Sequence, residues 1–270
     1  MTRPVRVAVQ IQPGGTPDYR TWRDAVLAAD DLGVDVIFGY DHFHRPAMKG
    51  IVDGKPVMYD EQPDVSNFEG WTALASWAEI TTRAEIGLLV TGVGFRNPDL
   101  LADMARTVDH ISGGRVVLGL GAGWYEKDYT TYGYDYGTFK TRFDLFDAGL
   151  ERIEHRLQNL NPAPVRDIPI LIGGSGPKRS LPAVAKHAHI WHAFLPVDKF
   201  TEASKLVGEL AEANGRKDSD IERSSVWENA QDADAYRDAG VTLFTNEIHP
   251  TAEGYDFSIL EKMIAWRDSQ

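Results

Sequence analysis

The sequence has no cysteine in its 270 residues. Disulfide bonds, thiolate metal sites and cysteine nucleophiles are therefore excluded. It also has no apolar run near the about 18 residues that a membrane-spanning helix needs, and its first residues lack the segments of a signal peptide. We therefore expect a soluble, cytoplasmic protein.

Basic residues are in short supply. The chain has 28 Lys and Arg against 40 Asp and Glu, which gives a formal net charge of −12. Such an acidic chain is not expected to bind nucleic acid or an anionic membrane surface. A small-molecule ligand is compatible with this charge, because one local basic pocket is enough to bind a small anion. Hydrophobic residues make up 43% of the chain, which allows a large core.

Strand-like and helix-like segments alternate from one end of the chain to the other. Apolar runs predict eight strands, at residues 5–12, 34–40, 84–91, 115–123, 168–172, 188–195, 221–227 and 241–248. Segments with helical spacing follow them, at residues 18–32, 69–81, 97–111, 138–158, 180–187, 198–214, 232–239 and 257–267. Eight strand–helix pairs with no linker between them predict an α/β fold, a (β/α)8 barrel, with residues 1–270 as one domain.

The predicted strand at 115–123 continues after Arg115 as an apolar run and contains three alternating glycines, the last of them Gly123. Such a run is typical of a strand buried on both faces, and glycine in it usually marks the close approach of another backbone or of a ligand. Trp124, Tyr125 and Glu126 follow at its C-terminal end, where barrels build active sites. We take Glu126 as a candidate catalytic acid. The two aromatic residues fit either ligand stacking or the core.

The tetrapeptide Asp41-His42-Phe43-His44 stands at the end of the second predicted strand. Residues two apart share a face of a strand, so His42 and His44 can point the same way. His42 is our candidate general acid or base, with Asp41 as its hydrogen-bonding partner. Histidines bonded to the backbone are the structural alternative, and paired metal ligands are another functional one. Structural or surface positions are expected for His187, His189, His192 and His249.

Residues 173–176, Gly-Gly-Ser-Gly, lie between the fifth predicted strand and its helix. Glycines let backbone N–H groups approach an anion, and the following helix adds the positive end of its dipole. Lys178 and Arg179 bring positive charge to the same place. A tight turn that needs a positive φ is the alternative. The combination favours an anion-binding site.

Three segments, in the same order along the chain, resemble the bacterial luciferase-like superfamily of flavin and deazaflavin oxidoreductases. They are GYDHFH at residues 39–44, RNPDLLADMARTVDHISGGRVVLGLGAGWYEKDYTTYG at 96–133 and IPILIGGSGPKRSLPAVAKH at 168–187. The first resembles the Asp-His-Phe of the coenzyme F420-dependent branch. The third resembles the phosphate-binding strand and helix of the superfamily.

The resemblance implies a luciferase-like barrel with coenzyme F420, or alternatively FMN, across the carboxyl ends of its strands. In such enzymes the Asp-His pair lies beside the reactive ring, and the third strand carries a bulge with a non-prolyl cis peptide, matched here at Leu89 and Val90. The implied contacts are Asp41, Leu89, Val90, Thr91 and Gly92 at the ring, and Gly173, Gly174, Ser175 and Gly176 at the phosphate.

The expected function is that of a coenzyme F420-dependent oxidoreductase, which transfers hydride between the deazaflavin and a small organic substrate. His42 would give or take the accompanying proton, held by Asp41. Three alternatives stay open: an FMN-dependent luciferase-like monooxygenase, a metal-dependent barrel hydrolase, and a barrel that binds the cofactor without turnover. Relatives often form homodimers, which we expect here too. The long loop at 45–68 is expected to shape the substrate pocket.

Overall fold

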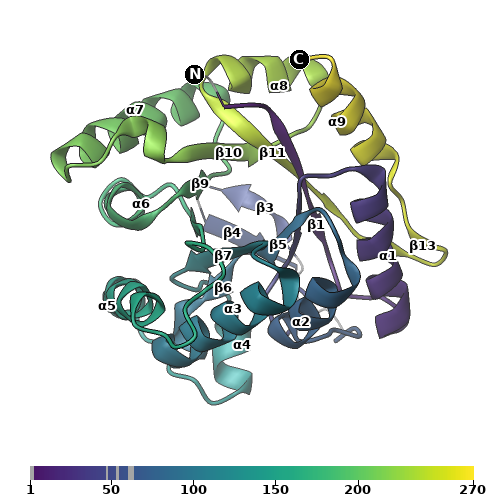
Figure 1. Cartoon of the computed structure of the whole chain (residues 1–270), viewed down its shortest axis with the longest axis horizontal. Coiled ribbons are helices and arrows are strands. Elements are labelled where there is room, and N and C mark those ends of the chain that lie inside the picture. The colour runs from purple at the N-terminus through teal and green to yellow at the C-terminus, as the bar shows by residue number, and fades with distance from the viewer. Residues whose placement is uncertain (1–2, 47, 53–54, 60–63) are drawn as a thin grey trace.

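Eight parallel strand positions close into a barrel with helices around it, as the sequence predicts (Figure 1). The computed structural model describes residues 3–46, 48–52, 55–59 and 64–270. The strands follow the order β5-β2-β1-β11-β10-β9-β8-β7-β6, and a further pairing of β5 with β7 closes the ring. Their bounds are β1 Arg6–Ile11, β2 Val36–Gly39, β5 Glu85–Leu88, β6 Thr91–Gly92, β7 Val116–Gly121, β8 Ile170–Gly173, β9 Ile190–His192, β10 Glu222–Val226 and β11 Val241–Ile248.

The helices begin and end at the residue types that the sequence supplies for this purpose. Asp18 accepts a hydrogen bond from the Thr21 amide at the start of α1, and Gly33 ends that helix with a φ of 97°. Asn97 caps α3 in the same way. The helices are α1 Tyr19–Leu32, α2 Gly70–Ile80, α3 Pro98–Ser112, α4 Glu126–Thr131, α5 Phe139–Gln158, α6 Ser180–His187, α7 Val197–Ala213, α8 Ala230–Asp238 and α9 Ser258–Asp268.

The third strand position is interrupted by a bulge between β5 and β6. The peptide bond from Leu89 to Val90 is cis, at the place that the family resemblance implies. The glycines of β7 make room for this bulge: a Cβ on Gly119 would lie 2.0 Å from the Leu88 carbonyl oxygen, and one on Gly121 would lie 2.7 Å from Val90 Cγ2. Two of the alternating glycines in the fourth strand are therefore required by a neighbouring chain segment.

Several short pieces of secondary structure are not predicted from the sequence. The predicted loop at 45–68 contains an antiparallel hairpin, β3 Met48–Val52 with β4 Lys55–Met58, which falls inside the ring of helices in projection (Figure 1). Helix α4 follows β7 directly, and a second small hairpin, β12 Pro250–Thr251 with β13 Gly254–Tyr255, follows β11. These pieces have few residues each and lack the long period by which helices and strands are recognised.

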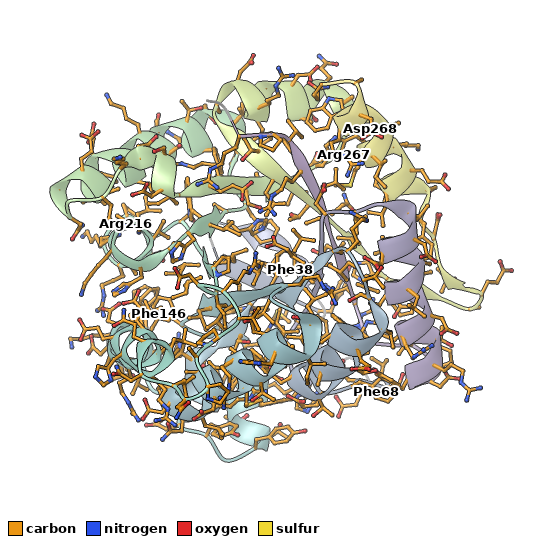
Figure 2. All side chains as sticks on the ribbon, viewed as in Figure 1. Phe38, Phe68, Phe146, Arg216, Arg267 and Asp268 are labelled. Atoms are coloured by element: carbon orange, nitrogen blue, oxygen red, sulfur yellow. The ribbon has the colours of Figure 1, made fainter. Side chains whose placement is uncertain are left out.

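The core has an inner and an outer part. Phe38 lies at the centre of the molecule and packs inside the barrel with residues such as Leu171 and Ile190 (Figure 2). Phe146 of α5 belongs to the larger cluster between the strands and the helices. Among the described residues, no helix has both the length and the apolar composition that crossing a bilayer requires.

Candidate active site

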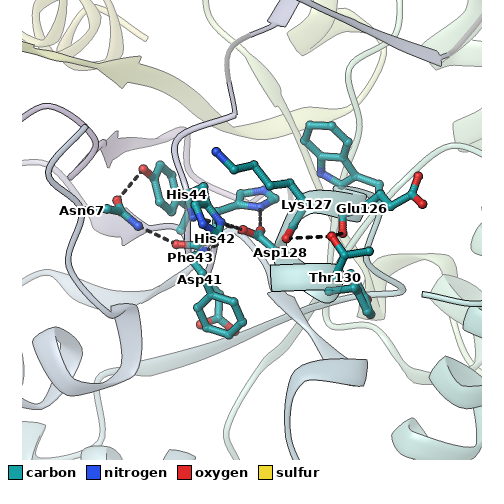
Figure 3. A network of polar contacts seen from close by, with 12 residues as sticks. Asp41, His42, Phe43, His44, Asn67, Glu126, Lys127, Asp128 and Thr130 are labelled. Atoms are coloured by element: carbon teal, nitrogen blue, oxygen red, sulfur yellow. Dashed lines mark hydrogen bonds and ion pairs between the residues drawn. The ribbon is translucent and has the colours of Figure 1, made fainter. Parts of the chain in front are cut away.

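One buried carboxylate gathers the two histidines at the end of β2. Asp128, in the first turns of α4, lies 2.7 Å from Nδ1 of His42 and 2.9 Å from Nδ1 of His44 (Figure 3). The backbone amides of Phe43 and His44 donate to the same carboxylate at 3.1 and 3.0 Å. Because an ionised carboxylate only accepts hydrogen bonds, both imidazoles carry their hydrogen on Nδ1. Nε2 of each ring is left as the basic nitrogen.

Asp41 has a different partner from the one that the sequence analysis assigned to it. Its carboxylate forms a bidentate pair with Arg96, with N–O distances of 2.5 and 2.8 Å, and Arg96 also bonds Glu69 at 2.7 Å. The prediction that Asp41 is the hydrogen-bonding partner of His42 is therefore wrong: that partner is Asp128. Burial raises the pKa of Asp41 to about 6, and the Arg96 guanidinium limits the rise, so the carboxylate is charged at neutral pH. Asp41 anchors the segment that carries His42.

Glu126 is not brought to the histidines. It is exposed at the first position of α4, and its carboxylate points away from His42 (Figure 3). The carboxylate that reaches them is Asp128, two residues further along. Helix α4 begins directly after the strand end, and its turn places the second acidic residue, not the first, toward the barrel.

Three aromatic rings surround His42. The ring centroids of Tyr40, Trp124 and Tyr125 lie 5.5, 5.4 and 5.8 Å from that of the imidazole, all nearly perpendicular to it. Asn67 closes the group on one side, because its amide donates to the His42 carbonyl at 2.8 Å while its oxygen accepts from the Tyr40 hydroxyl at 2.8 Å. His42 thus has a fixed orientation at the edge of the barrel mouth.

Only some of the bulge residues that were predicted to contact the cofactor ring are accessible at the mouth of the barrel. Leu89 and Val90 are half-buried and pack against the inner cluster of the barrel. Thr91 and Gly92 are buried, and the Thr91 hydroxyl accepts a hydrogen bond from the indole of Trp71 in α2, outside the barrel. Gln10, which the sequence analysis did not select, donates to the Leu89 carbonyl at 2.5 Å and holds the bulge. Its signal in the sequence is a polar residue within the otherwise apolar run at residues 7–11.

The Gly-Gly-Ser-Gly segment after β8 leaves backbone donors free. Within the part of the chain that the structure describes, the N–H groups of Ser175, Gly176 and Ser180 have no hydrogen-bond acceptor. They lie at the N-terminus of α6, where the helix dipole favours an anion. Of the two basic residues there, Arg179 is already paired with Asp144 and Asp147 on α5, at 2.9 and 2.8 Å. Lys178 is exposed and remains as the nearby cation.

The histidine pair does not have the surroundings of a metal centre. Within the described ranges, no group of three or more His, Asp or Glu side chains is arranged to hold a metal ion. His42 and His44 instead share the Asp128 carboxylate through Nδ1. The donor set gives no support to the hydrolase alternative.

Comparison with known proteins agrees with this architecture. The luciferase-like monooxygenase family matches residues 3–239 of the chain. A Mycobacterium tuberculosis protein whose name describes a coenzyme F420-dependent oxidoreductase is 26% identical over 224 residues, which cover 72% of this chain and 55% of that protein. The chain thus spans little more than half the length of this relative.

Solved structures share the fold at low sequence identity. An F420-dependent secondary alcohol dehydrogenase in complex with an F420-acetone adduct has a TM-score of 0.78 and 14% identity, with 97% of each chain covered. The FMN-bound oxygenating constituent of 3,6-diketocamphane monooxygenase from Pseudomonas putida has a TM-score of 0.61 and 16% identity, covering 83% of this chain and 67% of that one. With the family match over most of its length, the chain belongs to the luciferase-like monooxygenase family and shares its barrel fold.

Proposed function

We propose that the protein is a coenzyme F420-dependent oxidoreductase that transfers hydride between the deazaflavin and a small organic substrate. The observation that supports this most is the pairing of His42 with the buried Asp128 at the barrel mouth. Across the same mouth, the segment at 173–176 offers unpartnered backbone donors for a phosphate. The name of the mycobacterial relative favours F420 over FMN.

The residues at the mouth fit a flat ring with an anionic tail. Leu89 and Val90 offer a half-buried apolar surface on one side, and the free N–H groups of Ser175 and Gly176 with exposed Lys178 offer donors and charge on the other. When bound, the deazaflavin supplies a ring carbon that accepts or gives a hydride. The chain itself then has to orient the substrate and handle one proton.

His42 is the residue that we assign to that proton. Its Nδ1–H is committed to Asp128, so Nε2 is the nitrogen that can take a proton from a substrate hydroxyl, or return one to a carbonyl in the reverse direction. The negative charge of Asp128 stabilises the imidazolium that forms. Trp124 and Tyr125 pack against the imidazole. Asp41, through Arg96, holds the backbone that precedes His42 in place.

A binding panel with F420, FMN, FAD and NADP tests the cofactor. Quenching of the fluorescence of the seven tryptophans reports binding to the purified protein. We expect F420 to bind at least tenfold more tightly than FMN. Tighter binding of FMN would support the monooxygenase alternative instead, and binding of neither would contradict the proposal.

Three variants then test the proton step, on whichever small secondary alcohol or ketone changes the F420 absorbance. His42→Gln should lower kcat by about 100-fold or more, because it removes the basic nitrogen. Asp128→Asn should lower it by about tenfold or more, because the imidazolium loses its counter-charge. His44→Gln is the matched control, because His44 is bonded to the same Asp128 carboxylate as His42. Unchanged kcat in His42→Gln would show that this residue does not carry the proton.

A further inference from the structure

A second histidine lies at the barrel mouth, on the strand opposite His42. His192 is the last residue of β9, and β9 is four strands away from β2 around the closed ring in either direction. Side chains alternate along a strand: Ile190 belongs to the inner cluster and Trp191 to the outer one. His192 therefore points into the barrel, one layer above Ile190, and it is only 2% exposed.

The imidazole of His192 has one partner and one unsatisfied nitrogen. Nδ1 lies 2.9 Å from Oγ of Ser224, its register partner on β10. Nε2 is buried, and within the described residues it has no hydrogen-bond partner. If the Ser224 hydroxyl donates to Nδ1, only the Nε2–H is left over. If the hydroxyl accepted instead, both its own hydrogen and Nε2 would lack partners. The first arrangement leaves fewer buried groups unsatisfied, so Nε2 carries a hydrogen.

An unsatisfied buried donor is costly, and packing alone does not explain it. Such a donor loses its hydrogen bonds to water on folding and gains none in return. Burial lowers the pKa of His192 to about 4, so the ring is neutral at physiological pH and offers a single N–H. The ring of Phe194 lies over His192, edge to face at 4.8 Å, and is itself 58% exposed. A side chain whose ring is largely exposed therefore lies against the buried imidazole.

The neighbours of His192 are the two segments proposed to hold the cofactor. Gly173 is the register partner of His192 on β8, and the carbonyl oxygen of His192 accepts a hydrogen bond from the Gly174 amide at 3.0 Å. On the other side of Gly173 lies Val90 of the bulge, whose Cγ1 is 3.5 Å from where a Cβ on Gly173 would stand. Because Gly173 has no side chain, it does not screen the imidazole from that part of the mouth.

We propose that His192 is a cofactor-binding residue whose Nε2–H donates a hydrogen bond to a carbonyl oxygen of the bound ring. This inference rests on the proposed function, because it requires a deazaflavin or flavin in the mouth. We assign a carbonyl acceptor because a neutral imidazole supplies one N–H donor and no charge to pair with a phosphate. In this proposal His192 binds the ring of the cofactor, and His42 transfers the proton.

The test uses a pair of variants, one that keeps an N–H donor and one that does not. Met and Gln have side chains of equal length, so His192→Met removes the N–H while His192→Gln retains one. His155→Met, on the exposed face of α5, is the matched control for the exchange itself. For each protein, we would measure the F420 dissociation constant by tryptophan quenching and the thermal midpoint of the free protein. Nitrogen-15 spectra of histidine-labelled protein, with and without F420, report directly on the Nε2–H.

We expect His192→Met to bind F420 about tenfold more weakly, and His192→Gln within about threefold of the parent protein. The free His192→Met protein should unfold at the same temperature or higher, because an unsatisfied polar group has been removed. The Nε2–H resonance of His192 should shift when F420 is added.

Two results would overturn the proposal. If His192→Met bound F420 as tightly as the parent and unfolded at a lower temperature, His192 would be a packing residue. If F420 affinity were unchanged but KM for the substrate rose, the donor would face the substrate and not the ring. Failure of the parent protein itself to bind F420 and FMN would contradict the proposed function, and this inference with it.

Discussion

Asp128 and Asp41 are two buried carboxylates whose desolvation is compensated in different ways. Asp128 accepts four hydrogen bonds from the segment that carries the histidines. Asp41 is compensated by the full charge of Arg96 in a bidentate pair. A hydrogen-bonded carboxylate orients its donors, whereas an ion pair mainly anchors the backbone. Asp128 therefore fixes the orientation of the two imidazoles, and Asp41 fixes the position of the backbone at the start of the segment that carries them.

The neutral His192 makes stability depend on pH in a defined window. Its pKa is about 4 in the folded protein, against 6.5 for an exposed histidine. Between these values the unfolded chain binds a proton that the folded protein does not, so the contribution of this residue to the free energy of unfolding falls as the pH drops from about 6.5 to 4. At about 1.4 kcal/mol per pKa unit, the loss approaches about 3 kcal/mol at pH 4.

Urea unfolding of the parent protein and of His192→Met at pH 7, 5.5 and 4 measures this loss. Because other titrating groups are common to both proteins, the difference between their unfolding free energies isolates His192. Relative to the variant, the parent should lose about 3 kcal/mol between pH 7 and pH 4. A difference that stays constant across these pH values would show that the histidine is protonated, or exposed, in the folded protein.

At the scale of elements, the turn from β7 into α4 fixes where Asp128 stands. Gly123 has a φ of 78°, and a Cβ there would lie 1.8 Å from the hydroxyl oxygen of Tyr129. Tyr129 is buried and packs on Phe95, with ring centroids 4.9 Å apart, so it cannot move aside freely. Since Tyr129 follows Asp128 directly in α4, any displacement of the tyrosine also displaces the carboxylate that holds His42.

Gly123→Ala should therefore affect both stability and activity. We expect a loss of about 2–4 kcal/mol in the free energy of unfolding, from the left-handed backbone and the collision together. The value of kcat should also fall, because Asp128 shifts. Gly133→Ala is the matched control: its φ is 73°, but nothing lies within 4 Å of the added Cβ, so only about 1 kcal/mol should be lost. Equal losses in both variants would rule out the collision with Tyr129 as the cause.

The strands of the barrel could be predicted from the sequence, whereas the partners of the site residues could not. The eight barrel strands were predicted because an apolar run is a local signal that barrel closure does not alter. His42 was found because it stands at the end of such a run. Its partner Asp128 is 86 residues away, and the partner of Asp41 is 55 residues away. Those pairings depend on which strands are neighbours and on the direction in which each turn leaves the barrel, and a single sequence does not contain that geometry.

The same limit applies to the histidines expected at structural or surface positions. Burial and exposure do divide them: His187 and His192 are buried, whereas His189 and His249 are exposed. What the pattern could not show is that His192 faces the interior of the barrel with an unsatisfied nitrogen. That fact depends on strand register, since a shift of one residue would have turned His192 outward and Trp191 inward.

At the scale of the whole molecule, a network of ion pairs lies at the end of the barrel opposite the candidate active site, which we call the floor. Arg6 of β1 reaches across to Glu222 of β10 at 2.5 Å and to Glu85 of β5 at 2.6 Å. Arg166, which precedes β8, bonds Glu85 at 2.5 Å, and Thr242 of β11 donates to Glu222 at 3.0 Å. These groups come from β1, β5, β10 and β11 and from the segment before β8. The network therefore links both halves of the chain at the floor of the barrel.

Arg6→Met tests how much this closure contributes to stability. Removing the guanidinium leaves Glu222, only 3% exposed, without its counter-charge, and we expect a loss of about 3 kcal/mol in the free energy of unfolding. Glu222→Gln in the same chain should recover part of that loss, because the buried charge is then gone as well. Lys186→Met breaks an ion pair with Glu151 on the exposed face of the helices and should cost under about 1 kcal/mol. F420 affinity should stay unchanged in all three variants, since the floor and the mouth lie at opposite ends of the strands. An Arg6→Met variant that lost no more stability than Lys186→Met would show that water screens these ion pairs. The apolar layers inside the barrel would then keep the barrel closed without a contribution from these charges.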